Sequence, residues 1–240
     1  MFCSRWKPFA TGHPLLPSAA EKTRRSSIVC YVTDGKSLTT GDRTAAVLAQ
    51  IRKAVAAGTD WVQIRERDLP ALDLLSLTRR ALGEAKSGTA KIILNDRVDV
   101  ALAAGAAGVH LGSESLPVGD VLRWCRALDA PRNWLVGASC HSLEQARQAE
   151  KAGASYIFFG PVFETPSKRP FGPPQGVVKL AEVCRAVEIG VIAIGGINEA
   201  NGVECLQAGA AGVAAIRLFQ QPGAPTRLRR TIEALHSPDV

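Results

Sequence analysis

The sequence has no hydrophobic run long enough to cross a membrane as a helix. No part of its 240 residues approaches the roughly 18 uninterrupted apolar residues that such a helix needs. Aromatic residues are scarce, at 5%, and no basic stripe is interleaved with them. A nucleic-acid-binding surface is therefore not predicted. Residues 1–26 carry +4 of the net charge of +7, and the mildly basic remainder fits an enzyme that binds phosphates.

Paired cysteines are also lacking. The six cysteines are irregularly spaced and none forms a C-x-x-C pair, so neither a zinc site nor a secreted disulfide framework is predicted. The first 26 residues contain several prolines and an excess of basic residues, without the continuous apolar region of a signal peptide. We expect residues 1–26 to be a disordered extension and the protein to be cytoplasmic.

From Ser27 onward, short apolar segments rich in β-branched residues alternate with longer segments of helical periodicity. Several short segments are almost wholly apolar, as expected for parallel strands that are covered on both faces. We predict eight strands, at Ile28–Val32, Trp61–Arg65, Lys91–Leu94, Gly108–Leu111, Leu135–Ala138, Tyr156–Phe159, Val191–Ile194 and Gly212–Ile216.

The longer segments predict helices, and four of them end at a glycine that lies just before a strand. Glycine there relaxes the left-handed turn that returns the chain to the sheet. Regular alternation implies a parallel sheet with right-handed crossovers, and eight units favour a single (β/α)8 TIM barrel over residues 27–240. A doubly wound open sheet is the alternative, but no G-x-G-x-x-G follows the first strand. The predicted helices include Arg43–Ala57, Leu69–Leu82, Val118–Leu128, Leu143–Ala152, Val177–Val187 and Asn198–Gln207, and the four glycines are Gly58, Gly105, Gly153 and Gly209.

Polar, charged and glycine residues follow the predicted strands, where a barrel of this kind places its ligand. Gly195 and Gly196 follow the seventh strand, and the pair predicts either a phosphate site at a helix N-terminus or a plain tight turn. The other strand ends carry Gln63, Arg65, Asn95, Asp96, His110, Gly112, Ser139, His141, Arg217 and the segment 160–168.

Seven motifs at these ends occur in a fixed order: Q-I-R-E-R at 63–67, L-N-D at 94–96, G-V-H-L-G at 108–112, G-A-S-C-H at 137–141, F-G-P-V-F-E-T at 159–165, A-I-G-G-I at 193–197 and G-A-A-G-V-A at 209–214. Together they resemble the thiamine phosphate synthase/TenI family over roughly residues 27–220. The resemblance implies a TIM barrel with a place in thiamine synthesis.

The family contains two chemistries. The synthase branch joins hydroxymethylpyrimidine diphosphate to thiazole phosphate, with loss of pyrophosphate and with Mg²⁺ as the implied cofactor. The TenI branch is a thiazole tautomerase that moves a proton and needs no diphosphate site. Both branches imply small phosphorylated partners rather than macromolecules.

The resemblance also implies roles for individual residues. Arg65 and Lys168 would contact the diphosphate, Asp96 would bind Mg²⁺, and His141 matches the histidine that the TenI branch uses as acid and base. Alternatives remain: Asn95 and Asp96 fit a helix N-cap, and His141 fits a structural histidine. Further substrate contacts are implied for Gln63, Arg67, Asn95, Ser139, Thr165, Ser167, Gly195 and Gly196.

Three positions depart from the synthase pattern. Ser115 stands where the synthase has a second metal-binding aspartate, and Glu114 is the candidate to replace it. Arg67 stands in place of a lysine, and Arg217 in place of a phosphate-contacting serine. The synthase is the leading hypothesis; a tautomerase, a non-catalytic relative that binds the same ligands, and a barrel for another phosphorylated metabolite are the alternatives. A homo-oligomer is one alternative to a monomer.

Overall fold

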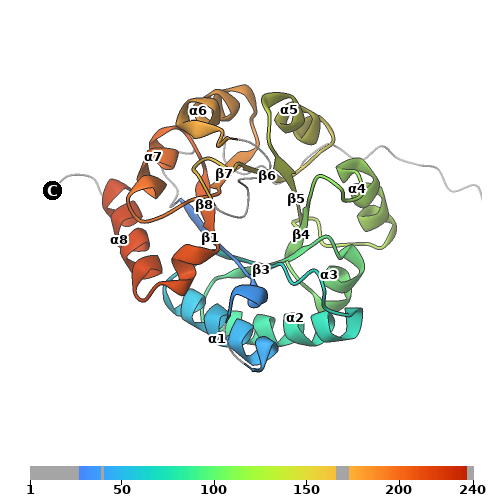
Figure 1. The fold of residues 1–240 in the computed structure, drawn as a ribbon. Coiled ribbons are helices and arrows are strands. Elements are labelled where there is room, and N and C mark those ends of the chain that lie inside the picture. Colours follow the sequence, from blue (N-terminus) through green and yellow to red (C-terminus); the bar gives the residue numbers. More distant parts are fainter. Residues whose placement is uncertain (1–26, 39–40, 166–172, 237–240) are drawn as a thin grey trace, which may run out of the picture.

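The computed structural model describes residues 27–38, 41–165 and 173–236, and within them eight parallel strands form a closed barrel. Each strand pairs with the next one along the chain, and β8 pairs with β1, so Figure 1 shows a ring of strands inside a ring of helices. All eight predicted strands are confirmed, with ends shifted by at most two residues. Their bounds are β1 Ile28–Val32, β2 Trp61–Ile64, β3 Lys91–Asn95, β4 Gly108–Leu111, β5 Leu135–Cys140, β6 Tyr156–Phe159, β7 Gly190–Ile194 and β8 Gly212–Ala215.

A helix follows almost every strand and packs on the outside of the barrel (Figure 1). The last of them, α8, is an addition to the helices predicted from the sequence. The helices are α1 Arg43–Ala56, α2 Ala71–Ala85, α3 Val98–Ala104, α4 Val118–Ala127, α5 Leu143–Lys151, α6 Gly176–Ala186, α7 Asn201–Gln207 and α8 Ala224–His236, with short 3₁₀ turns η1 Gly35–Ser37 and η3 Arg217–Gln220.

Two predicted helices begin later than expected, for local reasons. The helix predicted from Leu69 starts at Ala71, because Pro70 occupies its N-cap and cannot continue an earlier turn. The helix predicted from Asn198 starts at Asn201. The side chain of Asn198 accepts hydrogen bonds from the backbone N–H groups of Ala200 and Asn201, at 2.9 and 3.0 Å, and so holds a turn ahead of the helix.

The four glycines at the helix ends have positive φ angles, as predicted. The values are 80° at Gly58, 77° at Gly105, 93° at Gly153 and 97° at Gly209. A side chain would strain this left-handed turn, and glycine avoids the strain. The glycine repeated at these four helix ends therefore marks where each helix stops and the chain turns toward the next strand.

Side chains of each strand alternate between two cores, one inside the barrel and one beneath the helices. On β1, for example, Cys30 and Val32 belong to the inner core, whereas Val29 and Tyr31 belong to the outer one. Tyr156 is a fully buried side chain of the inner core, and a Cβ at position 137 would lie 2.1 Å from its ring. Glycine at 137 therefore makes room for the ring that fills the barrel.

Within the described ranges, no helix is both long and apolar enough to span a membrane. Five cysteines lie in these ranges, and all are buried, free thiols, as the absence of a disulfide pattern predicted. The proposed extension, residues 1–26, lies outside the described residues.

Arg229 of α8 binds the segments just before β1 and β2, at the face opposite the carboxyl ends of the strands. Its guanidinium donates to the carbonyls of Ser27 and Gly58, at 3.3 and 2.6 Å, and forms an ion pair with Asp60. Asp60 also accepts the backbone N–H of Val29 at 2.7 Å. The Arg229 side chain is only 10% exposed, so this ion pair is largely shielded from water.

We expect Arg229→Met to lower the free energy of unfolding by about 3 kcal/mol, because it removes the cation that pairs with Asp60 and the donor to two carbonyls. Chemical denaturation of the full chain measures this change. Arg227→Met is the matched control: Arg227 lies on the same helix but pairs with Glu199 at the surface, so its loss should change stability little. Equal losses in the two variants would contradict the assigned role of Arg229.

Candidate active site

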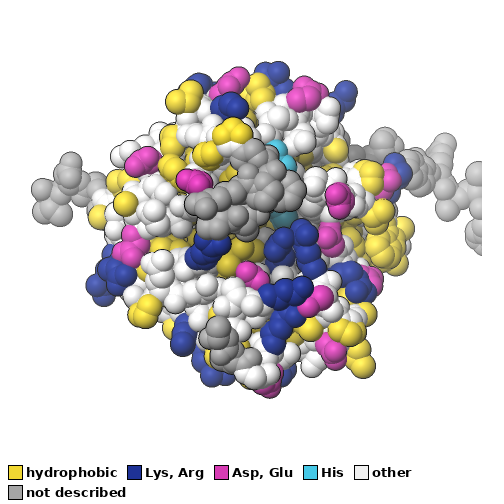
Figure 2. Space-filling model, in the orientation of Figure 1, with side chains coloured by type: hydrophobic (Ala, Val, Ile, Leu, Met, Phe, Trp, Pro, Cys, Tyr) yellow, Lys and Arg dark blue, Asp and Glu magenta, His cyan; other side chains and the backbone are white. Residues whose placement is uncertain are grey.

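The ends of the strands meet at one face of the barrel, and polar side chains gather there. Figures 1 and 2 look onto this face, on which η1 follows β1. Lys and Arg side chains cluster beside the centre of the face, over β3, with carboxylates among them (Figure 2). The barrel mouth therefore combines a positive surface with a few acidic oxygens, the composition predicted from the strand ends.

A chain of hydrogen bonds connects β2, β3 and the loop after β4. The amide of Gln63 donates to the Asn95 side-chain carbonyl at 3.1 Å, and the Asn95 amide donates to the Asp96 carboxylate at 2.8 Å. Ser115 donates its hydroxyl to the other oxygen of Asp96, and accepts the backbone N–H of Gly112 at 2.5 Å. The structure therefore brings together three residues that the sequence analysis placed in the site.

Asp96 has a backbone conformation that few residues other than glycine adopt. Its φ is 62°, and its backbone N–H donates to the His110 carbonyl at 3.0 Å. Such a conformation costs energy unless its surroundings hold it, and it often occurs where a side chain must be aimed. The N-cap alternative for Asn95 and Asp96 is wrong, because Arg97 is the residue that caps α3 and no side chain bonds to that cap.

Arg65 is half-buried at the end of β2, and it forms no ion pair with any residue that the structure describes. Burial, and then the neighbouring charge of Arg67, lower the pKa of its guanidinium. Arg67 is exposed beside it. Two adjacent cations without a carboxylate partner in contact make this part of the mouth suited to an anionic group.

Glu66 lies between these two arginines in sequence, but its side chain points away from solvent and is 1% exposed. Its carboxylate accepts the Thr33 hydroxyl at 2.7 Å and the backbone N–H of Gly35 at 2.9 Å, and it pairs with Arg43 of α1. Thr33 in turn accepts the backbone N–H of Arg65 at 2.9 Å. Glu66 therefore connects the loops after β1 and β2 and holds the backbone of Arg65.

Ser139, at the end of β5, contacts a buried histidine rather than the Asp96 chain. Its Oγ lies 2.9 Å from Nε2 of His110, and Nδ1 of His110 lies 3.2 Å from the Tyr156 hydroxyl. The ring of Phe158 stacks on His110 with centroids 4.2 Å apart. Ser139 thus sits on top of the aromatic side chains that fill the barrel.

Gly195 and Gly196 have φ angles of 97° and 68°, and both face the loop after β6. A Cβ on Gly195 would lie 2.6 Å from Cα of Pro161, and one on Gly196 would lie 2.6 Å from the carbonyl of Glu164. Close packing of two loops therefore explains the pair without a ligand. The pair therefore forms a tight turn, and its binding of phosphate stays a prediction.

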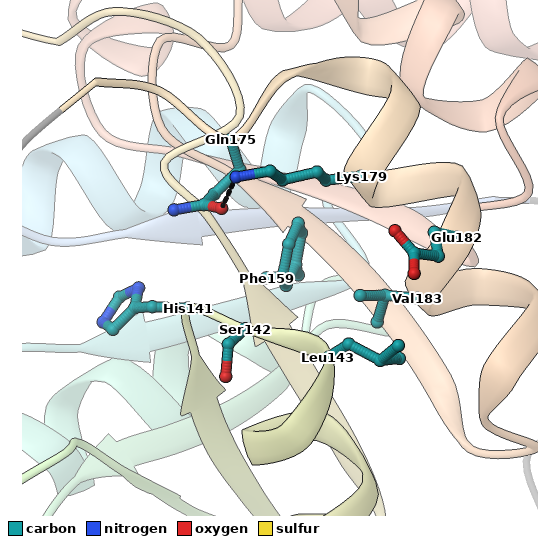
Figure 3. Close-up of a pocket in the computed structure, with 8 residues that line it drawn as sticks. All are labelled: His141, Ser142, Leu143, Phe159, Gln175, Lys179, Glu182 and Val183. Atoms are coloured by element: carbon teal, nitrogen blue, oxygen red, sulfur yellow. Dashed lines mark hydrogen bonds between the residues drawn. The ribbon is translucent and has the colours of Figure 1, made fainter.

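His141 lies apart from the residues above, beside a cavity of about 380 Å³ between α5 and α6. Its Nδ1 bonds to the carbonyl of Gly160, so Nδ1 carries the proton and Nε2 is left as an acceptor. Figure 3 shows Lys179 and Glu182 entering the cavity from α6, on the side opposite to His141. No hydrogen bond or ion pair among the described residues joins His141 to Arg65 or Asp96.

Comparison with known proteins gives a consistent match. The family model described as thiamine monophosphate synthase matches residues 29–219. The chain belongs to this family.

Relatives and a solved structure agree with the family match. A curated protein of Geobacter sulfurreducens is 45% identical over 192 residues, which are 80% of this chain and 88% of the relative. The thiamine-phosphate synthase of Roseiflexus sp. is 38% identical over 208 residues, covering 87% of this chain and 84% of that protein. The thiamine phosphate pyrophosphorylase structure from Pyrococcus furiosus is 30% identical, with a TM-score of 0.76 and coverage of 88% of this chain and 98% of that one.

The three departures from the synthase pattern have clear places in the structure. Ser115 makes the hydrogen bond to Asp96, whereas Glu114 is exposed and makes no hydrogen bond or ion pair within the described part of the chain. Arg67 is exposed beside Arg65, and Arg217 is exposed on η3 after β8. A neutral hydroxyl thus takes the place of the second family carboxylate next to Asp96.

The loop after β6 is described only in part. Thr165 is its last described residue before the gap. Ser167 and Lys168, which the family resemblance assigned to phosphate and diphosphate, lie outside the described residues, so their roles stay predictions.

Three residues of this face escaped the sequence analysis as functional residues: Glu66, His110 and Tyr156. Glu66 lies within the quoted Q-I-R-E-R motif, and His110 within G-V-H-L-G. Their spacing carries no signal for these contacts, because the partners lie on different strands. Only the position of His110 was noted, and no chemistry was assigned to it.

We expect Glu66→Gln to lower the free energy of unfolding by about 2–3 kcal/mol, because an amide cannot accept the hydrogen bonds of Thr33, Gly35 and Arg43 together. Asp68→Asn is the control, since Asp68 binds the same Arg43 but is 43% exposed, and little change is expected. The denaturation midpoints of the two variants are compared. An unchanged midpoint in Glu66→Gln would show that the buried carboxylate does not stabilise the fold.

Stability should also depend on pH through His110. Burial, and then the charge of Arg65, lower its pKa from 6.5 to about 3. Between these values the unfolded chain binds a proton that the folded chain excludes, so stability falls as the pH is lowered through this window. The slope attributable to His110 is up to about 1.4 kcal/mol per pH unit. Unfolding measured between pH 6.5 and 4 should be less pH-dependent in His110→Gln; the same slope in both proteins would be the contrary result.

Proposed function

We propose that the chain is a thiamine-phosphate synthase that joins hydroxymethylpyrimidine diphosphate to thiazole phosphate and releases pyrophosphate. The main supporting observation concerns Arg65, which is half-buried and has no carboxylate partner among the described residues. It lies close enough to Asp96 for the two charges to interact. Relatives of similar length carry the name of this activity. The reaction breaks a carbon–oxygen bond of the pyrimidine diphosphate and forms a carbon–nitrogen bond to the thiazole.

Arg65 and Arg67 are the residues suited to the diphosphate. The leaving pyrophosphate gains negative charge as its bond to carbon breaks, so cations already in place favour the transition state more than the bound substrate. The backbone N–H of Arg65 donates to the Thr33 hydroxyl, and this hydroxyl donates to the Glu66 carboxylate, so the backbone of Arg65 is held in place. Lys168, which matches a family lysine, is proposed as a third cation for the same group.

The donor set at Asp96 fits a magnesium ion that is carried by a diphosphate. The described residues contain no group of three His, Cys, Asp or Glu side chains that could hold a metal by themselves. One carboxylate and the Ser115 hydroxyl, with phosphate oxygens and water, suit Mg²⁺, which usually keeps several waters and binds one or two carboxylates. When bound, the ion would neutralise charge on the leaving pyrophosphate. Glu114 is proposed to contribute at most through water, because it is exposed.

Neutral donors and acceptors complete the site. Gln63 is buried at the mouth, where its hydrogen bond to Asn95 fixes the amide orientation, and Ser139 lies above the inner aromatic side chains. We assign these two to the planar pyrimidine. Thr165, Ser167, Gly195, Gly196 and Arg217 are proposed contacts of the thiazole phosphate.

The tautomerase alternative has one observation in its favour. His141 lines a cavity, and its Nδ1 bonds to the carbonyl of Gly160, so Nε2 is the ring nitrogen left for proton transfer. The catalytic role of His141 in the synthase therefore stays a prediction. A cytoplasmic location is supported by the five free cysteines, and a homo-oligomer remains a proposal.

Purified protein should form thiamine phosphate and pyrophosphate from the two substrates in the presence of Mg²⁺, and chelation should stop the reaction. Asp96→Ala should lower the rate by roughly 100-fold or more, an effect of the size seen when one group that stabilises a transition state is removed. Asp99→Ala is the control, because Asp99 is an exposed aspartate on α3 that pairs with Arg97.

Turnover that continues without Mg²⁺, or that survives Asp96→Ala, would contradict the synthase mechanism given above. Conversion of the non-aromatic thiazole tautomer, lost in His141→Ala, would instead establish the tautomerase. Binding of both substrates with neither reaction would identify a non-catalytic relative.

A further inference from the structure

Three side chains on neighbouring strands form a path from the barrel interior to the mouth. Tyr156 of β6 and His110 of β4 are fully enclosed, with exposures of 0% and 2%, and Ser139 of β5 is half-buried above them. Their contacts are 3.2 Å from the Tyr156 hydroxyl to Nδ1 of His110, and 2.9 Å from Nε2 to Oγ of Ser139. None of the three is exposed on the outer surface of the barrel.

The direction of the first hydrogen bond follows from the Tyr156 proton. Burial raises the pKa of this phenol well above 10, so the hydroxyl keeps its proton. Within the described chain, His110 is the partner recorded for that hydroxyl. A buried donor without an acceptor is unfavourable, so Tyr156 donates and Nδ1 of His110 accepts.

The second hydrogen bond is then determined. The rings of Tyr156 and Phe158 pack against His110, and an imidazole with one accepting nitrogen carries its single proton on the other nitrogen. Because Nδ1 accepts, that proton is on Nε2, which donates to Ser139. The Ser139 oxygen thus accepts a hydrogen bond from Nε2 of His110 on the inner side of the barrel. The Ser139 hydroxyl proton is therefore donated to a group other than His110.

We propose that Tyr156 and His110 are positioning residues that keep the Ser139 hydroxyl proton directed into the barrel mouth. This point of the site then offers a hydrogen-bond donor to a ligand atom that has a free lone pair. The proposal rests on the function given above for the identity of the ligand, but the direction of the hydrogen bonds does not.

Nuclear magnetic resonance of protein labelled with ¹⁵N-histidine tests the direction without any turnover. His110, assigned by its loss in His110→Gln, should show an unprotonated Nδ1 and a protonated Nε2 from pH 8 to pH 5. Tyr156→Phe removes only the hydroxyl and should produce a mixture of the two tautomers. A protonated Nδ1 in the unmodified protein, or an unchanged tautomer in Tyr156→Phe, would overturn the proposal.

Kinetics test whether the direction matters to the ligand. Tyr156→Phe should raise KM for one of the two substrates by about threefold to tenfold, the effect of weakening one neutral hydrogen bond, with a smaller change in kcat. Tyr31→Phe is the matched control, because its buried hydroxyl has no hydrogen-bond partner among the described residues and its side chain lies in the outer core.

A double variant separates positioning from general packing. If Tyr156 acts through Ser139, Tyr156→Phe should add nothing to the effect of Ser139→Ala. Additive effects would overturn the positioning role. Failure of the proposed function is distinguishable, because a chain that makes no thiamine phosphate would still show the His110 tautomer by resonance.

Discussion

Pairing of β8 with β1 is the constraint on which the rest of the structure depends. It closes the sheet, so that no strand has an unpaired edge and every side chain must point either into the barrel or towards the helices. Closure also requires close approach of neighbouring strands: a Cβ on Gly212 would lie 2.3 Å from the carbonyl of Ile28. Because all strands run in one direction, closure brings their ends together at one mouth, where the candidate site lies.

The mouth contains two separate hydrogen-bonded groups with different electrostatic character. Around Glu66 and Asp96, charged groups hold the loops after β1 to β4, and Arg65 and Arg67 form no ion pair with any described residue. Around His110 the groups are neutral, and burial keeps the ring uncharged. The charged group suits a diphosphate, and the neutral group suits a flat heterocycle. Arg65 belongs to the charged group and lies near enough to His110 for its positive charge to lower the pKa of that ring.

Much of this could be predicted from the sequence. The strands were found because apolar, β-branched segments recur at regular spacing, and the glycine endings marked the turns between helix and strand. The residues at the mouth could also be predicted, because in such a barrel they are the residues that follow each strand in the sequence. Helix starts were less accurate: the side chain of Asn198 and the ring of Pro70 shift them by local hydrogen bonding and geometry that periodicity does not contain.

The pairing of side chains from different strands was not predictable. Ser115 contacting Asp96, Glu66 holding Thr33, and Tyr156 reaching His110 all depend on strand register and on which way a side chain turns. The family motifs include three of these positions, Asp96, Glu66 and His110, without indicating their contacts. The sequence alone determined the barrel, its polar mouth and the family resemblance, because periodicity and motifs are local. Only the tertiary structure decided which of those polar groups meet. A hydrogen bond weakens when the distance between donor and acceptor changes by a fraction of an ångström, and residue spacing along the chain does not determine that distance.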